Sequence, residues 1–359
     1  MQESNKVLVI LVGAILLFFI GLVLHQLQAV LIPLVLATLI SHVFSPLVIR
    51  LKALKVPISL ILLLVLVLLS SVIGLAGLLI YTSTRSFLSE IPKYEARLSS
   101  LLDGMVVWIR DVAAMINVQF QPGDLQSLLD LSSLGNLIGF GIETSVFVTT
   151  WVFLIILCTL FILAGTGELS DKLAVAFPDG KSQRLMGIVQ NVGSQIREYI
   201  VKKTLISLGV GTLTGVTTWL MGVDFPLTWG LVAFLLNFIP NVGSAIAVLF
   251  PTLLAFLQFD TIVTPLMLMA ILISAQALLG NVVEPRVFAV SLNLSPLLIL
   301  ISLILWGWLW GAVGMVLAVP IMATIKIICE NVEMLRPMAI LMSRSSELEA
   351  RADVVIEKS

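Results

Sequence analysis

The strongest constraint on this chain is a series of long, continuously apolar stretches. Several come close to the roughly 20 helical residues that cross a hydrocarbon core of about 30 Å. Apolar residues do not alternate with polar ones, which excludes a β-barrel, and only helices satisfy their own backbone groups in lipid. The candidate segments are Val7–Leu24, Ala29–Ile49, Ile58–Tyr81, Thr144–Ala164, Thr204–Met221, Leu227–Ile239, Ala245–Phe256, Ile262–Leu279 and Leu294–Cys329. The sequence therefore predicts an all-α, polytopic membrane protein with about seven to nine membrane segments.

The composition excludes the soluble classes of protein. Hydrophobic residues make up 59% of the 359 residues and charged residues 11%, whereas globular domains are about half apolar and about a quarter charged. The net charge of -1 argues against a nucleic-acid partner, which would need a basic patch. Cys158 and Cys329 lie in apolar stretches without a CxxC partner or nearby histidine, so no metal site or disulfide framework is expected. Val7–Leu24 lacks a small-residue cleavage site and is interpreted as a retained first span.

Lysine and arginine in the short loops orient these spans. The loop after the second span carries Arg50, Lys52 and Lys55, while the first loop carries no lysine or arginine. This asymmetry places the N-terminus in the cytoplasm. Two further crossings put the basic stretch 172–203 on the same side, and the basic tail follows it there. The expected location is the bacterial inner membrane, with both termini cytoplasmic.

Five regions are predicted along the chain. They are N-terminal transmembrane helices (1–81), an extramembrane amphipathic helical domain (82–143), a transmembrane helix with a cytoplasmic amphipathic helix (144–203), a C-terminal transport core with broken helices (204–330) and a cytoplasmic tail (331–359). The cytoplasmic helix, Ser182–Lys203, carries an apolar stripe. We interpret it as an interfacial helix anchored by Lys202 and Lys203.

The external region has apolar residues at helical spacings of three and four from Phe87 to Ile116. Pro92 is compatible with the start of such a helix but not with its middle. A turn at Gln121-Pro122-Gly123 is expected to lead to a shorter helix near Asp124. We expect this region to pack against a sister subunit or the membrane surface. No polar cluster converges in it, so self-association into a homo-oligomer is favoured over the alternative, solute binding.

No catalytic constellation is present. The two histidines, His25 and His42, lack the HExxH spacing, and neither a GxxxxGK[ST] phosphate loop nor a GxSxG motif occurs. An intramembrane protease would need a Ser/His pair or paired aspartates on facing spans. We therefore expect a protein that is not an enzyme and needs no cofactor.

The C-terminal half contains three polar interruptions, of which the first is Asn237-Phe-Ile-Pro240-Asn241-Val-Gly243-Ser244. Proline and glycine free backbone groups here, and the amides and hydroxyl add donors and acceptors. In lipid, such backbone survives only where it is buried in protein or lines an aqueous cavity, and secondary transporters build solute sites from discontinuous helices. The short apolar arms on either side favour a re-entrant hairpin; the alternative is an ordinary turn at the membrane edge.

The second interruption is Asn281-Val-Val-Glu284-Pro285-Arg286. Glu284 and Arg286 are close enough in sequence to form an ion pair or to gate an entrance. Arg286 is the only basic residue between Lys203 and Lys326, which makes it a functional candidate. The alternative is a loop cation facing lipid phosphate.

The third interruption is Trp306-Gly307-Trp308-Leu-Trp310-Gly311-Ala-Val-Gly314. Gly307, Gly311 and Gly314 form a small-xxx-small pattern that predicts close helix packing. The tryptophans indicate either an interfacial belt or a hairpin tip. The charge-free stretch around them is too long for one span and barely long enough for two. A second re-entrant hairpin fits at least as well as two full crossings, and charge counting does not separate them because both return the chain to the same side.

These interruptions, in this order, resemble the autoinducer-2 exporter family, formerly an uncharacterised permease-like family. The matching elements are the Asn237–Ser244 run, Asn281-x-x-Glu284-Pro285-Arg286, Leu294-Ser295-Pro296, Trp306-Gly307-x-x-x-Gly311-x-x-Gly314 and Pro320. The resemblance implies a bacterial inner-membrane secondary transporter that exports autoinducer-2, a small hydroxylated signal in quorum sensing. It also implies a homo-oligomer, and other members look like cation/proton antiporters.

Export of a small uncharged polar solute is the function we expect. Such a solute needs amide and hydroxyl partners, and the candidates, with Pro240 and Gly243 shaping the turn, are Asn237, Asn241, Ser244, Gln276, Asn281 and Ser302. The alternative is sodium/proton antiport, which requires a membrane-buried carboxylate. Its gating or ion-coupling candidates are Asp224, Asp260, Glu284 and Arg286, and the three carboxylates lie at predicted loop ends. A structural or insertase-like scaffold would leave the polar interruptions unexplained.

Overall fold

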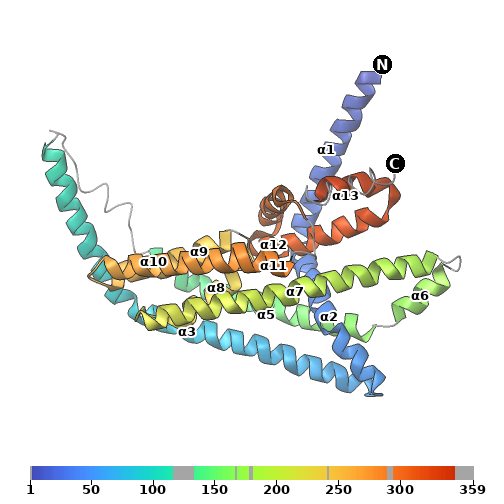
Figure 1. Ribbon diagram of the computed structural model, residues 1–359, viewed down its shortest axis with the longest axis horizontal. Helices are drawn as coiled ribbons and strands as arrows, with labels where there is room; N and C mark the ends of the chain where they lie inside the picture. The colour runs from blue at the N-terminus through green and yellow to red at the C-terminus, as the bar shows by residue number, and fades with distance from the viewer. Residues whose placement is uncertain are drawn as a thin grey trace. The chain divides into compact units, whose positions relative to one another are not determined.

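The computed structural model describes residues 2–115, 133–165, 168–177, 181–240, 242–288 and 294–343. These residues are almost entirely helical (Figure 1). The chain forms two compact units that interleave along the sequence. Unit 1 comprises Met1–Leu69, Trp151–Thr204 and Glu284–Ser359, and unit 2 comprises Ser70–Thr150 and Leu205–Val283.

The helices confirm the prediction of an all-α, polytopic membrane protein. They are α1 (Gln2–Gln26), α2 (Gln28–Ala53), α3 (Ile58–Met115), α5 (Ser133–Ala164), α6 (Glu168–Ala176), α7 (Lys181–Leu220), α8 (Pro226–Leu236), α9 (Val242–Gln258), α10 (Val263–Gln276), a π-helix (Ala277–Val283), α11 (Glu284–Phe288), α12 (Pro296–Asn331) and α13 (Arg336–Met342). By length and composition, four segments could cross a membrane: Gln28–Ala53, Ile58–Ser86, Val263–Val287 and Pro296–Asn331, the last of which is interrupted at Trp310 and Gly311. Shorter apolar helices cover Leu11–Gln26, Thr149–Ala164, Pro226–Leu236 and Val242–Gln258.

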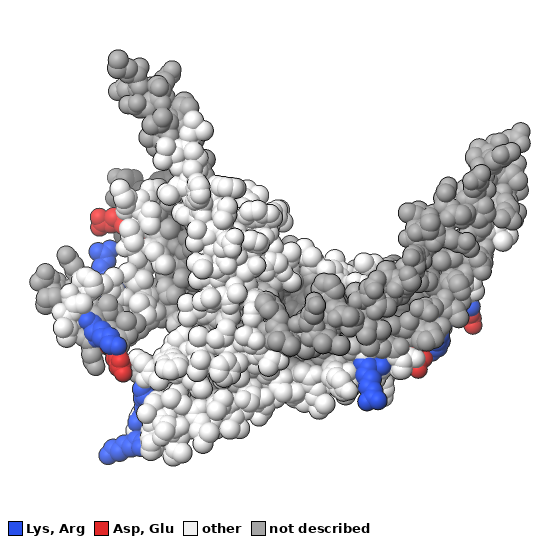
Figure 2. Space-filling view, turned by 180° about the vertical axis from the view of Figure 1, so that it is seen from behind, with Lys and Arg blue, Asp and Glu red and all other residues white. Residues whose placement is uncertain are grey.

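The described surface has the character of a lipid-facing one. Large apolar side chains are exposed along α1 and the first half of α3. Figure 2 shows a largely uncharged surface on which the charged side chains gather in small groups. An exposed apolar area of this extent indicates contact with a membrane.

Two predicted helix boundaries are wrong. The sequence predicted a span at Ile58–Tyr81 and a separate helix starting near Pro92, but α3 runs without a break from Ile58 to Met115. A proline inside a helix removes one hydrogen bond and crowds one carbonyl, which bends a helix more readily than it ends it when both sides favour helix. In the same way α7 joins the predicted interfacial helix to the following span. The predicted turn at 121–123 and the helix near Asp124 lie outside the described residues.

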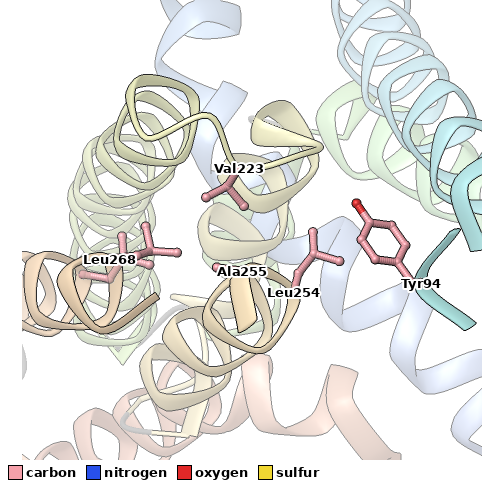
Figure 3. Packing of buried hydrophobic residues seen from close by; sticks show 6 residues of the cluster. Tyr94, Val223, Leu254, Ala255 and Leu268 are labelled. Atoms are coloured by element: carbon pink, nitrogen blue, oxygen red, sulfur yellow. The ribbon is translucent and has the colours of Figure 1, made fainter. Parts of the chain in front are cut away.

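Each unit has its own apolar core. In unit 1, α2, α3 and α5 pack through Val48, Ile61, Val65, Leu69 and Leu163. In unit 2 the core contains Tyr94 from α3, Val223 from the turn after α7, Leu254 and Ala255 from α9, and Leu268 and Leu272 from α10. Figure 3 shows Val223, Leu254 and Ala255 meeting between the helices, with Tyr94 approaching from α3.

The α8–α9 segment of unit 2 is a helical hairpin, as its polar interruption predicted. α8 ends at Leu236 and α9 begins at Val242. Val242 N donates to Pro240 O at 2.7 Å and Gly243 N to Ile239 O at 3.1 Å, which closes the turn. The 11 residues of α8 extend only about 16 Å at 1.5 Å per residue. This arm is too short to cross the membrane, which supports the re-entrant interpretation.

α12, in unit 1, is a second hairpin. Trp310 (φ -129°, ψ 15°) and Gly311 (φ 63°, ψ -146°) interrupt the helix. Ser302 Oγ donates to Ala318 O at 3.1 Å, which shows the two arms lying antiparallel. Gly311 occupies the left-handed region that glycine reaches at little cost, and a Cβ there would meet nothing within 4 Å. Its predicted role in helix packing is therefore corrected: Gly311 makes the turn.

The other two glycines of this pattern do serve close packing, but inside the hairpin. A Cβ on Gly314 would lie 1.9 Å from Trp306 O, and one on Gly307 would lie 2.9 Å from Met315 Cε. Gly307 and Gly314 therefore allow close packing between the two arms of the α12 hairpin.

Candidate transport site

Unit 2 places a buried amide at the base of the α8–α9 turn. Asn237 is the C-cap residue of α8, and its Nδ2 donates to Ser207 Oγ of α7 at 2.9 Å. Ser207 is fully buried and Asn237 nearly so. An amide and a hydroxyl can rearrange to donate to or accept from a polar solute without any net charge.

The face of α7 that continues from Ser207 is also polar and uncharged. Residues 207, 211, 214 and 218 follow a helical spacing on one side of α7, and all are buried. At Gly211 the two backbones touch, because a Cβ there would lie 2.7 Å from Gly230 O of α8. Thr218 Oγ1 donates to Thr214 O at 2.9 Å. This face therefore combines close helix approach with hydroxyl groups.

The buried polar side chains described in unit 2 share one property: none of them carries a charge. They are Ser207, Thr214, Thr217, Thr218, Asn237 and Thr252. Such an interior suits a neutral partner, because a charge buried without a counter-charge costs far more than a hydrogen-bonded neutral group.

The other predicted solute contacts lie in three places. Pro240, Gly243 and Ser244 lie with Asn237 around the α8–α9 turn, and Asn241 lies outside the described residues. Gln276 is the last residue of α10 and Asn281 is an exposed residue of the π-helix. Ser302 belongs to unit 1, where its hydroxyl closes the α12 hairpin.

Asp224 and Asp260, proposed for ion coupling, are bound to cationic and phenolic groups of α3. Asp224 Oδ2 accepts from Lys93 Nζ at 3.1 Å and from Tyr94 Oη at 2.5 Å. Arg97 forms an ion pair with Asp260. The hydrogen bond to Asp224 raises the pKa of Lys93. Burial, reinforced by the hydrogen bond to Asp224, raises the pKa of Tyr94.

These contacts fix the 93–97 part of α3 to the two turns of unit 2 that contain Asp224 and Asp260. The backbone around Asp224 is held as well, since Asp224 N donates to Gln258 Oε1 at 2.8 Å and Trp229 Nε1 donates to Asp224 O at 3.0 Å. A residue held through both its carboxylate and its backbone is suited to positioning helices.

Among the predicted coupling residues, Glu284 has the surroundings that differ most from the prediction. The sequence suggested a pair with Arg286, but the structure pairs Glu284 Oε1 with Lys203 Nζ of α7 at 2.6 Å. The Lys203 side chain is 2% exposed and that of Glu284 27%. Glu284 lies inside a helical run that continues from α10 through the π-helix to α11, so its predicted position at a loop end is also wrong.

Lys203 is the residue that the sequence interpretation missed. It was placed at the membrane interface with Lys202, but the Lys203 side chain is 2% exposed, whereas that of Lys202 is 29% exposed and pairs with Glu198. Neighbouring residues on a helix point about 100° apart, so the two lysines face different surroundings. The signal was present in the sequence: Val192, Ile196 and Tyr199 form the apolar stripe of α7, and Lys203 is its next member.

The tip of the α12 hairpin is held by the end of α1, within unit 1. Trp310 Nε1 donates to Leu24 O at 3.0 Å. His25 Nδ1 lies 2.7 Å from Leu309 O, and the His25 ring stacks on Trp308 with centroids 6.4 Å apart. Among the described side chains, no three His, Cys, Asp or Glu residues come together in a way that could hold a metal ion.

Comparison with known proteins identifies the family. The model of the AI-2E family transporters matches residues 8–334. This chain belongs to the AI-2E transporter family. The resemblance inferred from the three polar interruptions is therefore confirmed, and the protein is a multi-pass membrane protein of a transporter family.

This family member is similar to several curated proteins over almost its whole length. A protein of Borreliella burgdorferi named "Putative transport protein" is 30% identical, covering 93% of this chain and 90% of the relative. The AI-2 transport protein TqsA of Escherichia coli K12 is 29% identical, covering 94% and 95% respectively. YhhT of the same strain, also named a transport protein without a stated substrate, is 27% identical over 89% of each chain.

Proposed function

We propose that this AI-2E family member is a secondary transporter that exports a small, uncharged polar solute such as autoinducer-2. The observation that carries the proposal is the uncharged polar interior of unit 2, with the Asn237–Ser207 pair beside the α8–α9 turn. Its hydroxyl and amide groups match a hydroxylated solute, and a charged solute would enter it without a counter-charge. The similarity to a protein named for AI-2 transport supports the choice of solute.

Counterflow of labelled autoinducer-2 in proteoliposomes tests the proposal. Asn237→Ala and Ser207→Ala each remove one partner of the buried 2.9 Å hydrogen bond. Each should lower the exchange rate by roughly threefold to tenfold, because a hydrogen bond is worth about 0.5–1.5 kcal/mol. Thr212→Ala is the matched control, since Thr212 is an exposed residue of the same helix. If the wild type shows no counterflow, the proposed solute is wrong.

Cation/proton antiport is a second candidate, favoured by one observation, the buried Lys203–Glu284 pair. Such transport needs a carboxylate that can release its lysine partner and bind a cation or a proton in its place. The two candidates separate in the same vesicles. Antiport predicts sodium flux in the absence of any organic solute, whereas solute export predicts flux only when autoinducer-2 is present.

We also propose an orientation and an assembly. Both termini and the 172–203 segment lie in the cytoplasm of a bacterium, and the 87–134 segment lies outside the inner membrane. The 87–116 helix mediates self-association through Leu98, Leu101 and Met105, whose side chains lie outside the described residues. Replacing these three residues with serine should lower the oligomeric mass in detergent, and an unchanged mass would remove this helix from the interface.

A further inference from the structure

We infer that Lys203 and Glu284 form the proton-coupling site of this transporter, with Glu284 as the group that binds the proton. The inference rests on the proposed solute export and names the ion that drives it. The two side chains meet at 2.6 Å, Lys203 is 2% exposed and Glu284 is 27% exposed. The carboxylate is thus the member of the pair that solvent protons reach first.

The burial of the pair makes it sensitive to one proton. In the resting state the Lys203 ammonium donates to the Glu284 carboxylate, and the two charges compensate each other. Protonation forms one O–H bond on Glu284 and cancels its charge. The ammonium is then left buried without a counter-charge, which is strongly unfavourable. The two side chains must then separate, or Glu284 must release the proton again. The protein therefore has two states, one with the ion pair formed and one with Glu284 protonated and the pair separated.

Among the described residues, the ionisable groups to compare with Glu284 are Tyr199, Lys326, Glu330 and Arg286. Tyr199, one turn before Lys203 on α7, lies close enough to Glu284 to interact with its charge. It packs against Leu294, Val319 and Ala323, so the second arm of α12 is the neighbouring element. On that arm Lys326 is buried and lies 3.6 Å from Glu330. Arg286 is exposed.

Lys203 and Glu284 lie at the ends of two segments of unit 1. Lys203 lies one residue before α7 leaves unit 1, and Glu284 is the first residue after the chain returns to it. The ion pair therefore joins two segments of unit 1 that are far apart in the sequence. The π-helix Ala277–Val283 directly precedes Glu284, and π-helical segments often occur at functional sites. One proton bound on one side of the membrane and released on the other would complete the cycle: the O–H bond on Glu284 forms and breaks, and the ion pair with Lys203 opens and closes with it.

The test separates coupling from solute exchange in proteoliposomes. Counterflow of labelled autoinducer-2 measures exchange, and accumulation under an imposed pH gradient measures coupling, with a trapped pH dye reporting proton flux. We expect Glu284→Gln to reduce gradient-driven accumulation about tenfold more than it reduces counterflow, because a buried charge pair is worth more than a tenfold change in an equilibrium. Glu284→Asp, which keeps the charge, should recover part of the coupling.

Two further variants guard against a simple folding defect. The double variant Lys203→Gln with Glu284→Gln leaves no buried charge unpaired, so it should insert normally and still be uncoupled. The matched control is the more exposed pair on the same helix, Glu198→Gln with Lys202→Gln, whose side chains are 48% and 29% exposed and which should stay coupled. Accumulation in the double variant with the pH dependence of the wild type would overturn the inference.

If autoinducer-2 is the wrong solute, the assays give a different pattern of results from the one expected if the coupling site is wrong. If the wild type shows no counterflow of autoinducer-2, the trapped dye still reports whether a sodium gradient drives proton movement. Proton flux that disappears in Glu284→Gln would support the coupling site even though the solute is wrong. A wild type without proton flux in any of these assays, or with flux unaffected by Glu284→Gln, would overturn it.

Discussion

The α8–α9 turn can be tested by adding a single methyl group. A Cβ on Gly243 would lie 1.7 Å from Leu236 O and 2.6 Å from Leu236 C, both backbone atoms that cannot rotate away. The oxygen would have to retreat by about 1.3 Å to reach the 3.0 Å below which real Cβ contacts essentially never occur. Overpacking of a well-filled interior typically costs 1–3 kcal/mol. Because only backbone can yield here, Gly243→Ala should destabilise the protein by about 3 kcal/mol.

Gly209→Ala is the matched control for this change. Gly209 lies in α7, also in unit 2, and a Cβ there meets nothing within 4 Å. Alanine favours a helix over glycine by about 0.5–1 kcal/mol, so this variant should gain stability. Heating detergent-solubilised protein and measuring the remaining folded peak by size-exclusion chromatography compares the two. Equal midpoints for Gly243→Ala and the wild type would refute the tight closure of the hairpin.

Three other predictions concern the Asn237–Ser207 hydrogen bond, the Tyr94–Asp224 hydrogen bond and the membrane topology. Combining Asn237→Ala with Ser207→Ala should cost less than the sum of the single changes, since both remove the same hydrogen bond; additive losses in counterflow would show that the two residues act separately. Tyr94→Phe should lower stability by about 1–2 kcal/mol through the lost bond to Asp224. Because the pKa of Tyr94 is raised in the folded state, the contribution of its neutral hydroxyl to the free energy of unfolding is complete below pH 10.0 and is lost as the pH rises above that value. This loss of stability at alkaline pH should be smaller in the phenylalanine variant. In intact cells of a variant without native cysteines, an impermeant thiol reagent should label a cysteine at position 103 and not one at position 181; the reverse pattern would invert the proposed topology.

Much of the architecture could be predicted from local sequence. The apolar stretches indicated the membrane helices because their length and uniform polarity match a bilayer in any folded context. The two hairpins could also be predicted, because proline, glycine and asparagine interrupt helices through their own backbone chemistry. The exception is instructive: Pro92 lies within α3, since a single proline opposes a helix by only a few kcal/mol and the flanking residues favour helix.

The pairing of charged groups could not be predicted from sequence. Glu284 and Arg286 are neighbours along the chain, yet Glu284 binds Lys203, 81 positions away. Asp224 likewise binds Lys93 and Tyr94, which are 131 and 130 positions away. An ion pair is decided by which side chains the packed helices bring within a few ångströms, and sequence distance carries no information about that.

The sequence by itself thus determined the class of the protein, its helices, the turns within its C-terminal half and its family. Each of these depends on the chemistry of contiguous residues. The tertiary structure decided which lysine is buried, which carboxylates hold α3 in place and which polar groups share the interior of unit 2. Those properties depend on the packing of helices from distant parts of the chain, because burial and partner distance, and not residue type, set the energy of a charge or a hydrogen bond.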